Sequence, residues 1–159
     1  MVENRKSINP YDFIESFFGQ TGLLVTMDKE GNQNVMALDW KTIGELWSLP
    51  IITVAVAPSR YSFKLLTEGV KEFTLNIPSS KISKAISIAG SFSGRNTNKF
   101  QKANLEIIPG KRTKVPTIKD SLLSYECKII HETDSGTNIS HHLYFGKILA
   151  AYALTETIK

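Results

Sequence analysis

Apolar residues recur along the chain in two spacings, one typical of helices and one of strands. Residues 9–19 place three phenylalanines and an isoleucine at helical spacing, after an Asn-Pro start and before a glycine, which predicts a helix. Apolar runs at 23–27 and 35–38 flank the polar residues 28–32 and predict a hairpin. The β-branched run 51–57 stops at a proline and predicts a fully buried strand.

The middle of the chain alternates between the two spacings. Residues 59–68 and 79–88 have helical periodicity, and the strand predicted at 73–77 lies between them. A polar loop rich in glycine and serine follows at 90–98, and a short strand at 105–108 leads into a basic turn. Each break falls at a Pro, Gly or Ser.

The last third predicts two long strands, 122–132 and 139–154, joined by the loop 133–138. Apolar and polar residues alternate in the first of them, as in a half-buried strand. We therefore expect about six or seven strands and three or four short helices. Antiparallel hairpins at both ends, with helices between them, favour a mainly β, Greek-key type closed or split barrel over a doubly wound parallel sheet.

Composition narrows the class of protein. A chain of 159 residues suits one domain over residues 1–159. The single cysteine, Cys127, allows no intramolecular disulfide, and neither a signal-type segment nor a long apolar run is present, so we expect a cytoplasmic protein with no membrane partner. The net charge of +4 comes from scattered lysines, which suits a small phosphorylated ligand as well as nucleic acid.

Two segments have the composition of phosphate-binding loops. The turn 57–62, Ala-Pro-Ser-Arg-Tyr-Ser, connects a strand to a helix start and offers hydroxyls, a guanidinium and unpaired backbone N–H groups. The loop 89–95 combines two glycines with serines and Arg95, which permits close backbone approach to a ligand. Taken alone, the turn is more typical of a plain helix cap with a solvated Arg, and the loop of a flexible surface loop.

The strand around residues 34–40 mixes small, polar and aromatic residues, where a core strand favours β-branched ones. Either a planar heteroaromatic ligand lies along it, or it is an edge strand with a core tryptophan. Other chemistry finds little support. Adjacent His141 and His142 project to opposite faces of a strand, which disfavours a zinc site, and Cys127 on an apolar face is typical of core packing.

In order along the chain, these segments resemble the flavin-reductase-like family of FMN-binding split-barrel proteins, which includes flavoredoxins. The resemblance rests on Asn-Val-Met-Ala at 34–37, the turn 57–62, Phe-Thr-Leu-Asn-Ile-Pro at 73–78, and Gly-Ser-Phe-Ser-Gly-Arg at 90–95 with Lys-Phe at 99–100. It covers roughly residues 20–153, up to a closing hairpin that includes His141. Each motif is weak alone, and the ordered set is specific.

The resemblance implies a homodimer with one FMN per subunit near the interface. Its implied cofactor-binding residues lie in four groups: Asn34, Met36, Ala37, Leu38, Asp39 and Trp40 along the ring; Ser59, Arg60, Tyr61 and Ser62 at the phosphate; Asn76 and Ile77; and Gly90, Ser93, Gly94, Arg95, Lys99 and Phe100. His141 matches a family histidine near the flavin and is the only catalytic candidate, although a strand histidine bonded to a neighbour is the alternative. No metal is expected.

Two departures from the family pattern bear on the chemistry. Ala89 stands where many members have a cysteine, which argues against thiol chemistry beside the flavin. Asn96 and Asn98 stand where many have aspartates, which makes the loop more electropositive. The resemblance implies an oxidoreductase that moves hydride from NADH or NADPH to FMN, and electrons onward to an acceptor or a redox partner protein. The alternatives are an FMN electron carrier without NAD(P)H activity and, from another class, a nucleic-acid-binding barrel.

Overall fold

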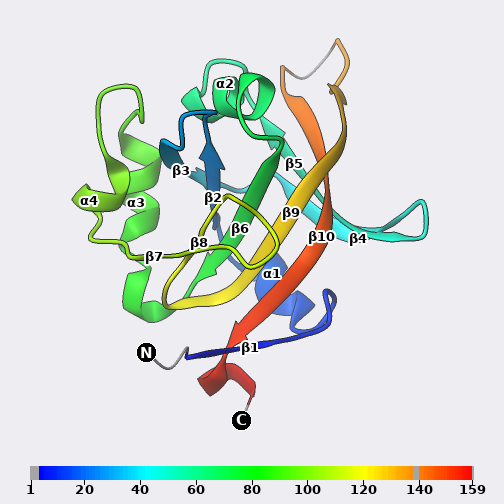
Figure 1. Cartoon of the computed structure of the whole chain (residues 1–159), viewed down its shortest axis with the longest axis vertical. Coiled ribbons are helices and arrows are strands. Elements are labelled where there is room, and N and C mark those ends of the chain that lie inside the picture. Colours follow the sequence, from blue (N-terminus) through cyan, green and yellow to red (C-terminus); the bar gives the residue numbers. More distant parts are fainter. Residues whose placement is uncertain (1–3, 138–139, 159) are drawn as a thin grey trace.

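The structure is a computed structural model and describes residues 4–137 and 140–158 (Figure 1). Its strands are β1 (Arg5–Ser7), β2 (Gly22–Met27), β3 (Gln33–Leu38), β4 (Lys41–Leu46), β5 (Leu49–Val56), β6 (Glu72–Pro78), β7 (Ile107–Ile108), β8 (Thr117–Ile118), β9 (Ser121–Asp134) and β10 (His142–Leu154). Its helices are α1 (Ile14–Gly19), α2 (Tyr61–Glu68), α3 (Ala85–Ser91) and α4 (Lys99–Lys102), with 3₁₀ turns η1 (Ser80–Ile82) and η2 (Thr155–Ile158).

Eight of these strands form one antiparallel sheet in the order β3-β2-β6-β9-β10-β5-β4, with β1 added along β10. The path runs from β3 to β4 without pairing these two ends, so the barrel is open on one side. The predicted mainly β, antiparallel fold is confirmed. Since β3 is an edge strand, its backbone groups on the side away from β2 meet no other described strand.

Two apolar clusters hold the sheet in shape. The larger one fills the inside of the coiled sheet around residues such as Leu24, Val54 and Tyr125. The second lies where α3 and α4 cover the outer face of β2 and β3, with Val35 against Ala89 and their neighbours (Figure 1). This second cluster fixes the 90–98 loop beside β3, because the loop connects the two helices that pack there.

Two predictions about local structure are wrong. The helix predicted at 9–19 begins only at Ile14, because the Asp12 carboxylate accepts the Asn9 N–H and Phe13 adopts a left-handed φ of 60°. Strand β4 was missed. It pairs with β5 through a tight turn at Trp47 and Ser48, which have φ of 55° and 57° without being glycines, so the usual Asn-Gly turn motif is absent.

Burial also differs from the pattern at two strands. β5 is not fully buried, because the outward-facing Thr53 and Ala55 are half-exposed. Conversely, β9 is buried on both faces along its first half, since the segment 111–118 covers Ser124 and Glu126 (2% and 0% exposed). The predicted helix at 79–88 divides into η1, capped by Ser79, and α3.

Other predicted elements keep their type and place. The hairpin of β2 and β3, the helix α2, strand β6 and the long pair β9–β10 lie at the predicted positions within a few residues. Residues 138 and 139, the predicted end of one loop and start of the last strand, lie outside the described residues. None of the described helices has both the length and the apolar composition that a membrane crossing needs.

Candidate functional site

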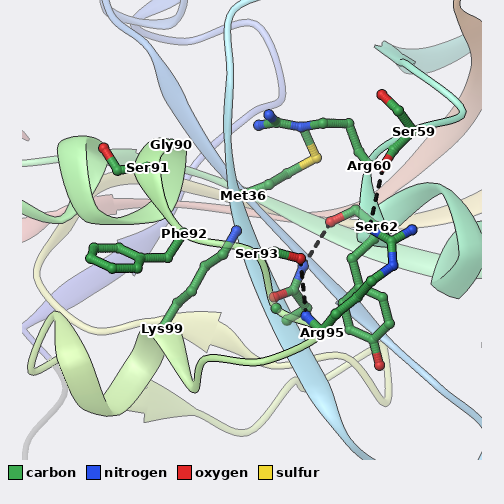
Figure 2. Close-up of a pocket in the computed structure, with 13 residues that line it drawn as sticks. Met36, Ser59, Arg60, Ser62, Gly90, Ser91, Phe92, Ser93, Arg95 and Lys99 are labelled. Atoms are coloured by element: carbon green, nitrogen blue, oxygen red, sulfur yellow. Dashed lines mark hydrogen bonds between the residues drawn. The ribbon is translucent and has the colours of Figure 1, made fainter.

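A hollow of about 310 Å³ opens where β3, the turn before α2, the loop after α3 and the start of α4 come together (Figure 2). It is called the cationic hollow below. The residues that line it are Asn34, Met36, Ser59, Arg60, Tyr61, Ser62, Gly90, Ser91, Phe92, Ser93, Gly94, Arg95 and Lys99. Three of these carry a positive charge and none carries a carboxylate, so the hollow is suited to an anion.

Lys99 is the most deeply placed of the three cations, with 5% of its surface exposed. Its ammonium donates to the Ala89 carbonyl at 2.9 Å, which uses one of its three donors. Burial, with the nearby Arg60 charge, lowers the pKa of Lys99 to about 8. Figure 2 shows the Lys99 side chain rising from α4 toward Met36. Both causes of the lowered pKa would be offset by an anion bound between these two cations.

The two arginines have different surroundings. Arg60 extends over Met36 in Figure 2, and its guanidinium makes no hydrogen bond or ion pair with any described residue. Arg95 is already engaged, because its Nη1 donates to the Ser59 carbonyl at 3.2 Å and its guanidinium lies 5.5 Å from the Tyr61 ring centroid. Arg60 is therefore the cation with the most unused donors.

The turn before α2 does not act as an ordinary side-chain cap. The cap position of α2 is Arg60, and no side chain accepts the first helical N–H groups. The buried Ser62 hydroxyl accepts from Asn34 Nδ2 at 3.0 Å, which ties the turn to β3. Unpaired N–H groups of α2 thus add to the positive potential beside Arg60.

A second hollow of about 260 Å³ adjoins the first, and the two share Met36 and Arg60. It is called the strand hollow, and its lining residues are Met36, Ala37, Leu38, Asp39, Trp40, Ala55, Ala57, Arg60 and His141. Trp40 is 66% exposed, so the alternative of a core tryptophan on this strand is wrong. Together the hollows form one elongated surface, charged at one end and lined by the edge strand β3 at the other.

His141 lies at the strand hollow, half-buried, just before β10. Its backbone N–H donates to the Ser135 hydroxyl, and its carbonyl accepts from the Ser135 N–H. No described residue forms a hydrogen bond with its imidazole ring. The neighbouring His142 is different, since its ring contacts Asp134 and Glu132 and packs on Phe63 outside the hollow.

The structure brings most of the sequence-predicted site residues to these two hollows, and leaves three elsewhere. Asn76 is fully buried, and both ends of its amide are engaged: the oxygen accepts from Ser124 Oγ and the Ile118 N–H, and Nδ2 donates to the Leu23 carbonyl and Thr74 Oγ1. Ile77 belongs to the interior core, and Phe100 packs against the outer apolar cluster. We leave these three out of the site.

Sequence reasoning missed four lining residues. Ser91 and Phe92 lie inside the glycine- and serine-rich loop that was identified, so the motif could have included them. Ala55 and Ala57 reach the strand hollow from the outward face of the chain around β5. That face was predicted to be buried, because alanine among β-branched residues gives no sign of exposure.

Within the described residues no group of three or more histidine, cysteine or acidic side chains is placed to hold a metal ion. Cys127 is fully buried in the interior core, and burial raises the pKa of its thiol well above the ordinary value. The prediction that it is a packing residue is therefore confirmed, and the chemistry of this site rests on its cations, hydroxyls and imidazole.

An open antiparallel barrel with an elongated, partly cationic groove along its edge strand defines a class of cofactor-binding folds. Residues 15–158 match the family model "Flavin reductase like domain". A protein of Archaeoglobus fulgidus is 34% identical over 116 residues, which are 73% of this chain and 63% of that protein. The chain thus belongs to the flavin-reductase-like family, as its sequence motifs predict.

Solved structures agree with this assignment. The flavoredoxin of Desulfovibrio vulgaris (Miyazaki F) matches with a TM-score of 0.72 and 29% identity, over 83% of this chain and 68% of that one. A Shewanella frigidimarina protein with a split barrel domain matches with a TM-score of 0.75 and 20% identity, over 89% of this chain and 71% of that one. The fold is therefore a split barrel, the predicted architecture.

Proposed function

We propose that this chain binds FMN, with the phosphate in the cationic hollow and the ring system along the strand hollow. The observation that supports it most is the set of Arg60, Arg95 and Lys99 around one hollow that no carboxylate lines. Unused donors on Arg60 and Lys99 match the oxygens of a phosphate, and the shared Met36 connects this end to the strand hollow, where the ring system would lie.

The chain's own groups suit a flavin ring at the strand hollow. Backbone groups of the edge strand β3 pair with no other described strand on the side away from β2, and there they are able to bond the polar edge of a ring. The imidazole of His141 lines the same hollow and offers its ring nitrogens as hydrogen-bonding groups. When bound, FMN supplies the capacity to accept a hydride and to pass on electrons. The chain is therefore proposed to act as an oxidoreductase that uses NADH or NADPH.

Two measurements test this proposal in sequence. Purified protein incubated with FMN and freed of excess flavin should be yellow, with flavin absorption bands. A colourless protein with no measurable FMN affinity would contradict the binding proposal and reopen the nucleic-acid alternative. Anaerobic addition of NADH or NADPH should then bleach the flavin absorption, with free FMN alone as the control.

A second function, electron carriage without a nicotinamide nucleotide, is supported by the 29% identity to a flavoredoxin. The same bleaching experiment separates the two, because a carrier keeps its flavin colour with either nucleotide and loses it with a chemical reductant such as dithionite. Retained FMN binding with no bleaching by NADH or NADPH would therefore favour the carrier.

We also propose that a second copy of the chain covers the outward face of β5 and β10. On this face Thr53 pairs in register with Phe145, and Phe145, His131 and the 60% exposed Trp47 form an aromatic cluster. Ala55 continues the same face into the strand hollow, so a partner seated there would adjoin the proposed flavin. Sedimentation velocity should give a dimer that Trp47→Ser weakens, and a wild-type monomer at micromolar concentration would contradict this.

A further inference from the structure

Gly94 makes an unusually close approach to the opposite wall of the cationic hollow. A Cβ at this position would lie 2.6 Å from Asn34 Cγ and 2.8 Å from Tyr61 Cδ2, closer than carbon atoms pack. Its φ lies outside the left-handed region, so only the lack of a side chain matters here and not backbone conformation. The loop after α3 therefore rests directly on β3 and on the first residue of α2.

The atoms that Gly94 touches are not free to move aside. Asn34 is 4% exposed and its Nδ2 donates to the Ser62 hydroxyl, itself 1% exposed. Any displacement of the Asn34 amide thus weakens a buried hydrogen bond to the turn that carries Arg60. The Tyr61 ring is also in contact with this loop, because the Arg95 guanidinium lies 5.5 Å from its centroid and donates to the Ser59 carbonyl.

We infer that Gly94 and Arg95 are positioning residues that clasp the 93–95 loop onto the turn before α2, so that the hollow holds the phosphate of FMN in preference to riboflavin. This inference rests on the proposed FMN site. It assigns contact with the phosphate to Arg60 and Lys99. Arg95 instead connects the 93–95 loop to the turn before α2, because its guanidinium donates to the Ser59 carbonyl and lies near the Tyr61 ring. Gly94 sets the distance between this loop and β3.

The test measures dissociation constants for FMN and for riboflavin by fluorescence quenching. In wild-type protein FMN should bind more tightly than riboflavin. The ratio of the two dissociation constants measures how much the phosphate contributes to binding. Gly94→Ala should raise the Kd for FMN by about tenfold or more, the effect of one lost buried hydrogen bond to a charged group, with riboflavin changed less than about twofold. Gly19→Ala, where a Cβ meets nothing within 4 Å, is the matched control and should leave both constants unchanged.

Two further variants separate positioning from general instability and from charge. Asn34→Ala combined with Gly94→Ala removes the nearest obstacle to the new methyl group and should restore part of the FMN preference that Gly94→Ala loses. Arg95→Lys keeps the charge and removes the planar fork, so it should lower the FMN preference.

The outcomes are distinct. A wild-type protein that binds neither flavin would contradict the proposed function itself. If wild type prefers FMN while Gly94→Ala and Arg95→Lys both keep that preference, the site stands and the clasp is wrong. A parallel loss of FMN and riboflavin in Gly94→Ala, with a lowered melting temperature, would also overturn the clasp in favour of a general structural role.

Discussion

Two polar clusters in this small barrel differ in where their hydrogen bonds go. Beneath the segment 111–118, the fully buried Glu126 accepts from the Arg112 N–H at 2.7 Å, the Thr113 N–H at 3.0 Å and the Tyr152 hydroxyl at 2.6 Å. In the cationic hollow, the Arg60 guanidinium has no such partner among the described residues. The first cluster satisfies itself, whereas the second has donors left for a ligand.

The ionisation of the two clusters follows the same contrast. Burial tends to raise the pKa of Glu126, but the hydrogen bonds from Tyr152 and the backbone outweigh it and bring the pKa below its ordinary value. The pKa of Lys99 is lowered to about 8 by burial and by Arg60, so here the surroundings disfavour the charge. The charge of Glu126 is thus stabilised by its own fold, whereas the charge of Lys99 is disfavoured by its surroundings and would be stabilised by a bound anion.

Breaking the self-satisfied cluster should have the largest effect on stability. Glu126→Ala leaves several buried donors without an acceptor, each costing about 1–3 kcal/mol, so the free energy of unfolding should fall by about 3–5 kcal/mol. Glu126→Gln keeps one acceptor oxygen and should lose about 1–2 kcal/mol. Urea denaturation measures both. Folded Glu126→Gln protein should bind FMN as wild type does, and a loss of FMN affinity without a loss of stability would contradict the structural role.

Removing the Arg60 guanidinium should have the opposite pattern of effects, with weaker FMN binding and no loss of stability. Arg60→Ala should weaken FMN binding by about 1.5–3 kcal/mol, as expected for a lost charge-assisted contact. The free energy of unfolding of the flavin-free protein should stay the same or rise, because the repulsion that lowers the pKa of Lys99 disappears. Titration with FMN and riboflavin checks this, and riboflavin affinity should be unaffected. Unchanged FMN affinity would remove Arg60 from the site.

The contrast also shows what the sequence could and could not predict. Helical and period-two spacing, together with continuous apolar runs for strands such as β2 and β5, predicted most elements. The same spacing marked Ser124 and Glu126 as exposed, since an irregular segment distant in sequence covers them and leaves no periodic trace. The tight turn at Trp47 and Ser48 was missed because neither residue is the glycine or asparagine that usually indicates a positive φ.

The candidate site was predictable to a similar extent. Local motifs identified the turn and the loop, because the residues that favour phosphate binding are adjacent in the sequence. That the turn and the loop lie at one site was predicted from the order of the family's motifs along the chain, and not from the properties of either segment. Asn76 was assigned to the pocket on that order alone, and in the structure its amide oxygen bonds Ser124 and the backbone of Ile118.

FMN binding in the cationic hollow should depend on pH, because it depends on the protonation of Lys99. Its pKa in the free folded protein is about 8, so the ammonium that attracts phosphate is lost as the pH rises through that value. FMN affinity should be nearly constant around pH 7 and then fall by up to about tenfold per pH unit above about 8. Lys99→Met should bind FMN more weakly and show a flat profile over this range. Riboflavin, which lacks the phosphate, should show no such dependence with wild-type protein.

The smallest effect is expected at Asn98, the N-cap of the short helix that carries Lys99. Its side chain accepts from the Gln101 N–H at 3.1 Å. Like Glu126, it therefore has a hydrogen-bond partner within the protein, although it lies next to the cationic hollow. Asn98→Ala should lower the free energy of unfolding by about 0.5–1 kcal/mol. Asn98→Asp keeps the cap and restores the acidic residue of many family members, so stability should hold while the added charge beside Lys99 weakens FMN binding by at most about fivefold. Tighter FMN binding by Asn98→Asp would contradict the idea that this loop works through its positive charge.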